Sequence, residues 1–297
     1  MMTMAIRFLS SITFFVCSIV VAHAASVLVD ADWVAPRLND PQLVLVDMSD
    51  AEQYSRFHLP GAVHLPYEAL LKRVPRQPFA ARLDDAVLYR LLGSLGIQRT
   101  HHVVIYDDAG GLHAGRLFWE LERIGHPQVS VLDGGLVAWV LQGRKVVNAP
   151  TSRLPATYVA SGGGRANEAT LAEVKRAASG DGPLLLDVRT QEEYVGTARD
   201  PRSGHVPGAR LWPWEQALDV SGGYTRANTA ALRESLARSG AGDTKKPVIA
   251  YCRSGHRASQ TYLMLRSLGY ENVRLYPNSM LEYAADPSAP VKQGTQP

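Results

Sequence analysis

The second half of the chain repeats the first, and this constrains the fold more than any other feature of the sequence. Four pairs of segments recur in the same order, at offsets of 140 to 147 residues. The pairs are Leu43–Asp47 and Leu184–Asp187, His58–Gly61 and His205–Gly208, Val103–Asp107 and Val248–Cys252, and Gly125–Val129 and Gly269–Val273. A chain of 297 residues is long enough for two domains that each bury a core. We therefore expect two homologous domains in tandem.

Residues 1–24 have the features of a secretory signal peptide. Arg7 supplies a positive charge, residues 8–21 form an apolar run, and Ala22, His23 and Ala24 form a small-x-small cleavage site. Cleavage after Ala24 would place the mature protein in the periplasm or otherwise outside the cytoplasm, without membrane attachment. An uncleaved anchor is the alternative, although the apolar run is shorter than the roughly 20 residues that a spanning helix needs.

The rest of the chain divides at a segment rich in Pro, Ser and Gly. Residues 148–164 show no sustained helical or strand period and end in three consecutive glycines, so we interpret them as a linker. The first domain is then expected over 25–147 and the second over 165–297.

Each copy alternates short apolar runs with longer segments of helical period, which is typical of an α/β fold with parallel strands. The runs are apolar on both faces, as strands covered by helices on two sides must be. The predicted strands are 43–47, 103–106 and 129–132 in the first copy, and 184–187, 248–251 and 273–276 in the second. Thr170 and Glu173 predict a capping box. Pro60–Gly61 and Pro207–Gly208 predict type II turns.

Removal of the signal peptide would leave Cys252 as the only cysteine. One thiol forms neither an internal disulfide nor a Cys-x-x-Cys redox pair, and it does not make a cysteine-rich metal site. Two uses remain for it. A free cysteine is commonly buried as a small apolar residue, or it acts as a nucleophile.

The residues around Cys252 favour the nucleophile. The predicted strand 248–251 is followed by Cys252, Arg253, Ser254, Gly255, His256 and Arg257, and then by a segment of helical period. A strand, a tight loop and a helix N-terminus direct unpaired backbone N–H groups at one point and favour an anion there. Ligands bind at this edge of a parallel sheet. The helix N-terminus and the neighbouring cations both favour the thiolate form of Cys252.

The tandem copies, the His-x-Pro-Gly turns, the loop at 252–257 and the Leu-Asp-Gly-Gly-Leu-x-x-Trp segment at 132–139 together resemble the rhodanese family of sulfurtransferases, in particular its exported two-domain members. The resemblance covers nearly the whole mature chain. It implies a parallel five-stranded sheet flanked by helices in each domain, with the active cysteine in the second. Asp107 stands where the second copy has Cys252, as in the inactive halves of the family, so we expect the first domain to lack the chemistry.

The resemblance implies a two-step reaction that requires no metal and no organic cofactor. Cys252 takes the outer sulfur of a small anionic donor such as thiosulfate, and cyanide or a small thiol then removes it from the persulfide. Loop amides would hold the persulfide, while the loop arginines would attract the anions. The expected substrate-binding residues are Arg253, Ser254, Gly255, His256, Arg257 and Arg189.

Three alternatives concern the reaction. Relatives that use 3-mercaptopyruvate tend to have an uncharged loop and an arginine before the tyrosine, whereas this loop is charged and Glu193 precedes Tyr194. We favour thiosulfate, although Arg189 or Arg199 could bind the carboxylate of mercaptopyruvate. A persulfide carrier without fast turnover on small donors is the second alternative. A phosphatase is disfavoured because its loop needs five residues between the cysteine and an arginine, whereas four separate Cys252 from Arg257 and position 258 is alanine.

Other polar residues are expected to be structural. We expect Asp47 and Asp187 to hold their own loops by hydrogen bonding, with Arg189 as the buried partner of such a carboxylate. His113, like His102, has no partner at metal-ligand spacing and is expected in a loop or in solvent. A formal net charge of +3 gives no reason to expect nucleic-acid binding.

Overall fold

The computed structural model of the chain describes residues 25–160 and 162–297. The expected signal peptide, residues 1–24, lies outside the described residues. Within those ranges, no helix is both long enough and apolar enough to cross a bilayer.

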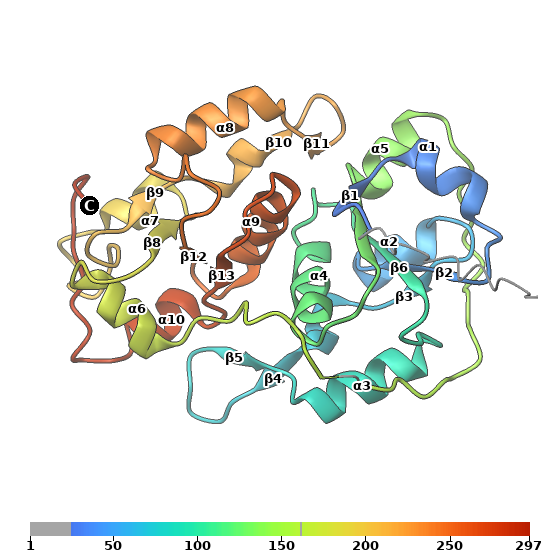
Figure 1. Cartoon of the computed structure of the whole chain (residues 1–297), viewed down its shortest axis with the longest axis horizontal. Helices are drawn as coiled ribbons and strands as arrows, with labels where there is room; N and C mark the ends of the chain where they lie inside the picture. The colour runs from blue at the N-terminus through green and yellow to red at the C-terminus, as the bar shows by residue number, and fades with distance from the viewer. Residues whose placement is uncertain (1–24, 161) are drawn as a thin grey trace, which may run out of the picture.

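The first domain is built on a parallel sheet of five strands, as expected (Figure 1). In spatial order the strands are β1 (Leu28–Val29), β7 (Val129–Leu132), β6 (His102–Tyr106), β2 (Leu43–Asp47) and β3 (Val63–His64). Every residue of β2 is buried because both faces of the sheet are covered. The predicted strands are confirmed, and β6 begins one residue earlier than predicted.

The second sheet has four parallel strands, so the prediction of five in each domain is wrong here. In spatial order they are β13 (Val273–Leu275), β12 (Val248–Tyr251), β8 (Leu184–Asp187) and β9 (Arg210–Leu211). A single parallel bridge between Glu168 and Leu275 takes the place that β1 has in the first sheet. The edge strand stops there because Thr170, two residues later, caps the next helix.

Helices flank both sheets (Figure 1). In the first domain they are α1 (Ala31–Val34), α2 (Ala51–Arg56), α3 (Asp85–Ser94), α4 (Ala114–Arg123) and α5 (Gly135–Leu141). In the second they are α6 (Leu171–Ala178), α7 (Gln191–Val195), α8 (Thr229–Arg238), α9 (His256–Ser267) and α10 (Ser279–Tyr283). Short 3₁₀ helices are η1 (Ala35–Arg37), η2 (Tyr67–Leu70) and η3 (Trp214–Ala217). The predicted capping box of Thr170 and Glu173 starts α6.

The two domains share one apolar core. Helices α3 and α4 cover the face of the first sheet that looks toward the second domain, while α8 and α9 cover the corresponding face of the second sheet. Helices α4 and α9 pack side by side at the domain boundary (Figure 1). Gly115 of α4 makes this close approach possible, because a Cβ there would lie 2.7 Å from the Ser259 carbonyl oxygen of α9.

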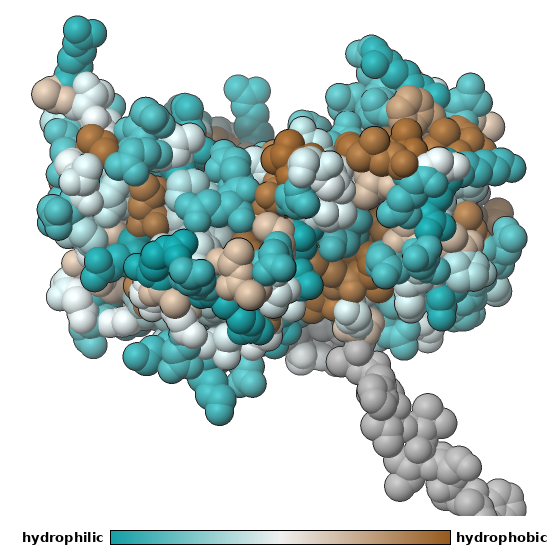
Figure 2. All heavy atoms as spheres, turned by 90° about the horizontal axis from the view of Figure 1, so that it is seen from above, coloured by the Kyte–Doolittle hydropathy of each residue, from teal (hydrophilic) through white to brown (hydrophobic). Residues whose placement is uncertain are grey.

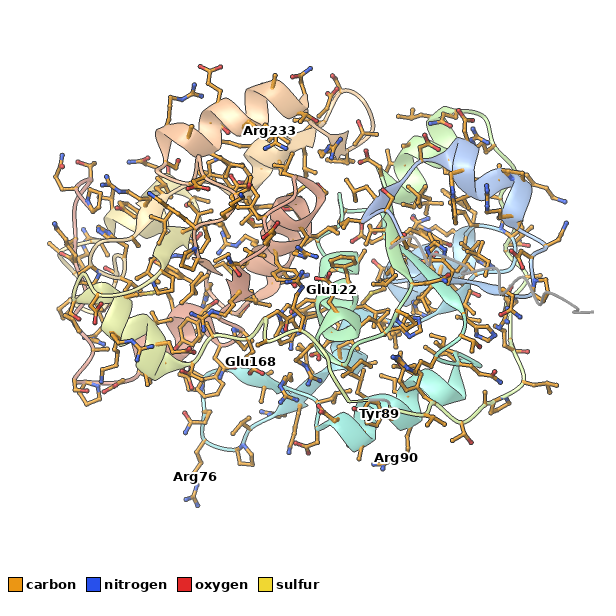
Figure 3. The ribbon with its side chains drawn as sticks, in the orientation of Figure 1. Arg76, Tyr89, Arg90, Glu122, Glu168 and Arg233 are labelled. Atoms are coloured by element: carbon orange, nitrogen blue, oxygen red, sulfur yellow. The ribbon has the colours of Figure 1, made fainter. Side chains whose placement is uncertain are left out.

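Each domain also extends a β-hairpin to the other. The first hairpin consists of β4 (Leu71–Arg73) and β5 (Ala80–Arg82), and the second consists of β10 (Leu218–Asp219) and β11 (Thr225–Arg226). Arg82 donates to the carboxylate of Glu168 at 3.0 Å, and the Arg226 backbone N–H donates to the carboxylate of Asp133 at 2.7 Å. Figure 3 shows Glu168 above the first hairpin, with Arg76 at its tip.

The two His-x-Pro-Gly segments form equivalent turns. Gly61 and Gly208 have φ angles of 80° and 79°, as the third residue of a type II turn requires. His205 stacks on Tyr194 with 3.7 Å between ring centroids, and its counterpart His58 makes the same contact in the first domain. The motif is therefore structural in both copies.

The segment expected as the linker runs along the first domain. Residues 148–160 and 162–164 contain no helix or strand. The Ala156 N–H donates to the Gly93 carbonyl at 2.8 Å, and the buried Tyr158 hydroxyl lies 2.9 Å from His126 Nδ1.

Candidate active site

Cys252 follows β12 directly and begins the loop that leads into α9. Its Sγ accepts a hydrogen bond from the Gly255 N–H at 3.2 Å. Gly255 has a φ of 84°, and a Cβ there would lie 2.1 Å from the Pro277 carbonyl oxygen. The loop can therefore turn this amide toward the sulfur only with glycine at position 255.

Cys252 is buried, with 1% of its surface exposed. Its backbone N–H donates to Ser279 Oγ at 3.1 Å, and its carbonyl accepts the N–H of Met280 at 3.2 Å. Ser279 has a φ of 51°, in the left-handed region that residues other than glycine seldom occupy. The start of α10 thus holds the backbone of Cys252 and thereby the position of its sulfur.

In the corresponding loop of the first domain, backbone N–H groups surround a carboxylate. Asp107, 1% exposed, follows β6 as Cys252 follows β12. Its carboxylate accepts four backbone N–H donors at 2.7 to 3.0 Å, from Ala109, Gly111, His113 and Ala114. The amides that precede α4 and begin it converge on one anionic group. In the first domain, the Asp107 carboxylate therefore occupies the point where these amides converge.

The two arginines of the Cys252 loop lie in different environments. Arg257 makes a bidentate ion pair with Glu193, with N–O distances of 2.6 and 2.8 Å. Burial opposes ionisation of Glu193, but Arg257 holds the pKa of this carboxyl below its usual value. Arg253 is exposed, and the described residues supply no ion-pair partner for it. Arg253 is thus the loop guanidinium available to an incoming anion.

Arg189 is the buried partner of a carboxylate, as the sequence suggested. It is 5% exposed and donates to Asp187 from Nε at 2.9 Å and from Nη2 at 2.6 Å. Nη2 also donates to the Gly204 carbonyl at 2.7 Å. Burial opposes its charge, yet Asp187 raises the pKa of Arg189 above its usual value. This guanidinium is already engaged by acceptors of the protein.

Two aromatic residues of the first domain complete the site, and sequence reasoning missed both. The ring of Tyr67 stacks on His256 with 4.0 Å between centroids, and His113 stacks on the same histidine at 4.9 Å. His113 lies in the turn before α4, as the expectation of a loop position had it, but that expectation did not include this packing at the domain boundary. One feature of the repeat could have drawn attention to Tyr67. Tyr67 and Trp214 are aromatic residues at equivalent positions, each six residues after the turn glycine of its copy.

Burial sets the protonation of the stacked rings. It lowers the pKa of His256 to about 3, with the charges of His113, Arg116 and Arg257 acting in the same direction. It raises the pKa of Tyr67 to about 12, and the charge of Cys252 adds to this shift. At neutral pH the ring of His256 is therefore uncharged and the hydroxyl of Tyr67 keeps its proton.

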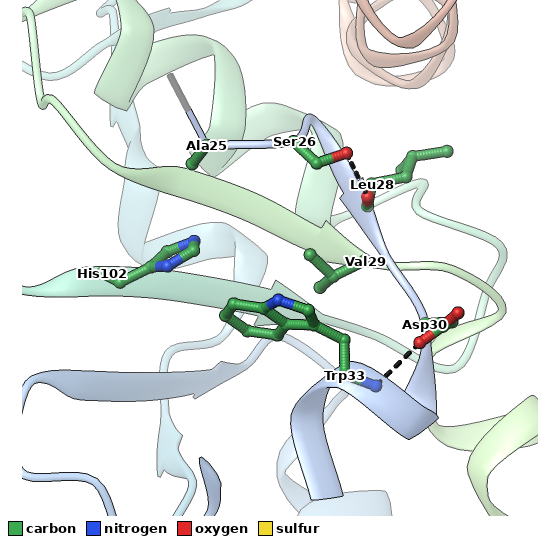
Figure 4. Close-up of a pocket in the computed structure, with 7 residues that line it drawn as sticks. All are labelled: Ala25, Ser26, Leu28, Val29, Asp30, Trp33 and His102. Atoms are coloured by element: carbon green, nitrogen blue, oxygen red, sulfur yellow. Dashed lines mark hydrogen bonds between the residues drawn. The ribbon is translucent and has the colours of Figure 1, made fainter. Parts of the chain in front are cut away.

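Two open cavities lie elsewhere in the first domain. One of about 350 Å³ is bordered by Trp33 and His102 (Figure 4). Another of about 240 Å³ lies between α2 and α5, next to the exposed Val140 and Leu141. Figure 2 shows apolar side chains gathered on this side of the molecule. Residues 252–257 line neither cavity. The described residues contain no cluster of three or more His, Cys, Asp or Glu side chains suited to a metal.

The sequence matches the family described as the rhodanese-like domain twice, over residues 30–142 and 170–286. It is 34% identical over 268 residues to a thiosulfate sulfurtransferase of Pseudomonas aeruginosa, covering 87% of this chain and 94% of the relative. The fold is similar to SseA of Escherichia coli, a 3-mercaptopyruvate sulfotransferase, with a TM-score of 0.75, 25% identity and coverage of 86% and 99%. It is also similar to EanB, with a TM-score of 0.78, 23% identity and coverage of 91% and 70%.

Proposed function

Because this chain belongs to the rhodanese-like family of sulfurtransferases, we propose that it moves a sulfane sulfur from thiosulfate to cyanide or a small thiol through a persulfide on Cys252. The observation that carries the proposal is the thiol at the N-terminal end of α9, with the Gly255 N–H directed at its sulfur. The first domain has Asp107 at this place, and a carboxylate does not form a persulfide.

The reaction has two displacements at sulfur. In the first, the Cys252 thiolate bonds to the outer sulfur of thiosulfate, the sulfur–sulfur bond of the donor breaks, and sulfite leaves with the electron pair. In the second, cyanide or a thiolate bonds to the outer sulfur of the persulfide, and the Cys252 thiolate is regenerated. The Gly255 N–H and the positive end of α9 stabilise the negative sulfur in both states.

The charges around the loop support thiosulfate over a 2-keto acid. Arg253 is exposed and free of an ion pair within the described residues, so it can draw a small anion to the site. The position before Tyr194 holds Glu193, whose carboxylate is paired with Arg257. Glu193 thus supplies no positive charge for the carboxylate of a 2-keto acid, and Arg189 is occupied by Asp187 and Gly204.

Mass spectrometry of the mature protein tests the persulfide directly. Thiosulfate should add one sulfur atom to the wild-type chain with release of sulfite, and cyanide should remove it as thiocyanate. Cys252→Ser should abolish sulfur loading and transfer completely, because the hydroxyl does not form a persulfide. Residual transfer in this variant would contradict the assignment. Absence of loading in the wild type would favour a carrier that receives its sulfur from a protein.

A second measurement tests the choice of donor. Sulfur loading from thiosulfate should be faster than loading from 3-mercaptopyruvate at equal concentrations. The reverse order would identify the keto acid as the donor and would overturn the argument from Glu193.

We also propose that the mature protein is exported, on the basis of the sequence over residues 1–24. Expression of the full chain should give a secreted form that begins at Ala25, and N-terminal sequencing checks this. A full-length chain found in the membrane would identify the segment as an anchor.

A further inference from the structure

Three polar atoms without partners occur where the first domain covers the Cys252 loop. His256 Nε2 and Arg116 Nε are buried and have no hydrogen-bond partner. The Tyr67 hydroxyl also has none among the described residues, although its side chain is 9% exposed. Arg116 itself is 1% exposed and lies on α4, in the first domain. Buried polar groups are seldom left unpaired in native proteins, so two such atoms on elements that pack together, next to the free hydroxyl of Tyr67, require an explanation.

The three groups lie close to one another and to the reacting sulfur. The rings of Tyr67 and His256 are in stacking contact at 4.0 Å. Arg116 lies on α4, which packs against both η2, with Tyr67, and α9, with His256. His256 is four residues from Cys252, in the first turn of the helix whose N-terminus faces the sulfur.

All three atoms can serve as hydrogen-bond donors. A tyrosine hydroxyl and a guanidinium Nε carry protons at neutral pH, and a neutral imidazole donates from Nε2 in one of its tautomers. Burial of His256 Nε2 and Arg116 Nε without a partner has a cost in free energy. A ligand rich in acceptor oxygens would remove this cost, whereas an apolar or cationic ligand would not.

We propose that Tyr67, His256 and Arg116 form a subsite that holds the oxygens of a sulfur oxyanion while its outer sulfur reacts with Cys252. This inference rests on the proposed function and extends it to the first domain, which supplies two of the three groups. As the donor's sulfur–sulfur bond breaks, the electron pair and the negative charge pass to the departing sulfite. Donors fixed around its oxygens stabilise that charge most strongly in the transition state.

Tyr67→Phe tests the subsite, because phenylalanine keeps the ring that stacks on His256 and removes only the hydroxyl. We expect kcat/KM for thiosulfate to fall about tenfold or more, since one donor to a developing oxyanion contributes at least that much. Tyr89→Phe is the matched control: it also removes a hydroxyl without a hydrogen bond, but on α3, away from the site (Figure 3). Its kcat/KM should stay within about twofold of wild type. Equal losses in both variants, or none in Tyr67→Phe, would overturn the proposal.

Alkylation of Cys252 gives a readout that does not depend on sulfur transfer. Iodoacetate carries acceptor oxygens and a negative charge, whereas iodoacetamide is neutral and similar in size. The ratio of the two rates should fall about fivefold or more in Tyr67→Phe and in His256→Phe, and it should not change in Tyr89→Phe. An unchanged ratio in both site variants would overturn the subsite. If the wild type failed to release sulfite from thiosulfate, the proposed function would fail and this ratio would still decide the subsite.

Discussion

At the scale of single residues, the two loops differ in the group that meets the converging amides. Asp107 offers a carboxylate that accepts four N–H donors, so its loop is internally satisfied. Cys252 offers a sulfur that accepts from Gly255 and can form a covalent bond to a second sulfur. The two loops thus differ at this one position, although both halves use the same arrangement of a strand, a loop and a helix N-terminus.

Replacement of Asp107 by alanine should destabilise the first domain. Four buried or partly buried amides would lose their common acceptor, and we expect the free energy of unfolding to fall by about 3 kcal/mol or more. Urea denaturation measures this. Asp108→Ala is the control, because the same side chain is removed one residue away and none of the four amides donates to it. A comparable loss in both variants would contradict the role given to Asp107.

At the scale of elements, the site is formed where α4 and α9 meet. These helices follow the Asp107 and Cys252 loops and therefore occupy equivalent places in the two copies. Their contact brings η2, with Tyr67, against the first turn of α9, with His256. The first domain thus contributes Tyr67 and His113 to the surroundings of the Cys252 loop.

Gly115→Ala should separate these two helices. A methyl group there would lie 2.7 Å from the Ser259 carbonyl oxygen, too close without movement of the backbone. Overpacking of this kind costs about 1 to 3 kcal/mol, and we expect both the melting temperature and the rate of sulfur loading to fall. Gly143→Ala adds the same methyl group at a residue of positive φ with open space around it. That variant should lose stability from backbone strain alone and should keep its loading rate.

At the scale of the whole molecule, polar bonds reinforce the apolar boundary between the domains. Glu122 of α4 accepts hydrogen bonds from Tyr262 and Arg266 of α9 (Figure 3). The Asn167 side chain donates to the Trp119 carbonyl and to the Tyr262 hydroxyl, both at 3.1 Å. Because Cys252 is 1% exposed beneath this boundary, a donor must pass the groups that cover the sulfur.

Acid should destabilise the molecule through its buried histidines. Burial lowers the pKa of His126 to about 4 and that of His256 to about 3, from a usual value of 6.5. Between pH 6.5 and the lowered pKa of each histidine, the unfolded chain binds a proton that the folded chain does not. The free energy of unfolding therefore has its full value above pH 6.5 and falls as the pH drops toward 4. We expect His126 alone to account for a loss on the order of 2 kcal/mol by pH 5.

Urea unfolding at pH 7.5 and pH 5 measures this effect. The difference between the two pH values should shrink in His126→Gln, because glutamine takes up no proton on unfolding. An equally large difference in that variant would place the acid sensitivity elsewhere in the molecule.

The sequence by itself determined what depends on neighbouring residues. The repeat predicted two equivalent domains, the apolar runs predicted the strands, and Thr170 with Glu173 predicted the start of α6. The position of Cys252 between a strand and a helix predicted an amide directed at its sulfur. Apart from the repeat, which compares distant segments, these features follow from local conformational preferences and local hydrogen bonds, which a few adjacent residues are enough to specify.

The tertiary structure decided what depends on residues far apart in the chain. It reduced the fifth strand of the second sheet to one bridge at Glu168, paired Arg257 with Glu193, and placed Tyr67 on His256, 189 residues away. Such contacts arise when the apolar faces of α4 and α9 are buried against each other, and packing at that boundary selects the side chains that meet. No local pattern in the sequence encodes that choice.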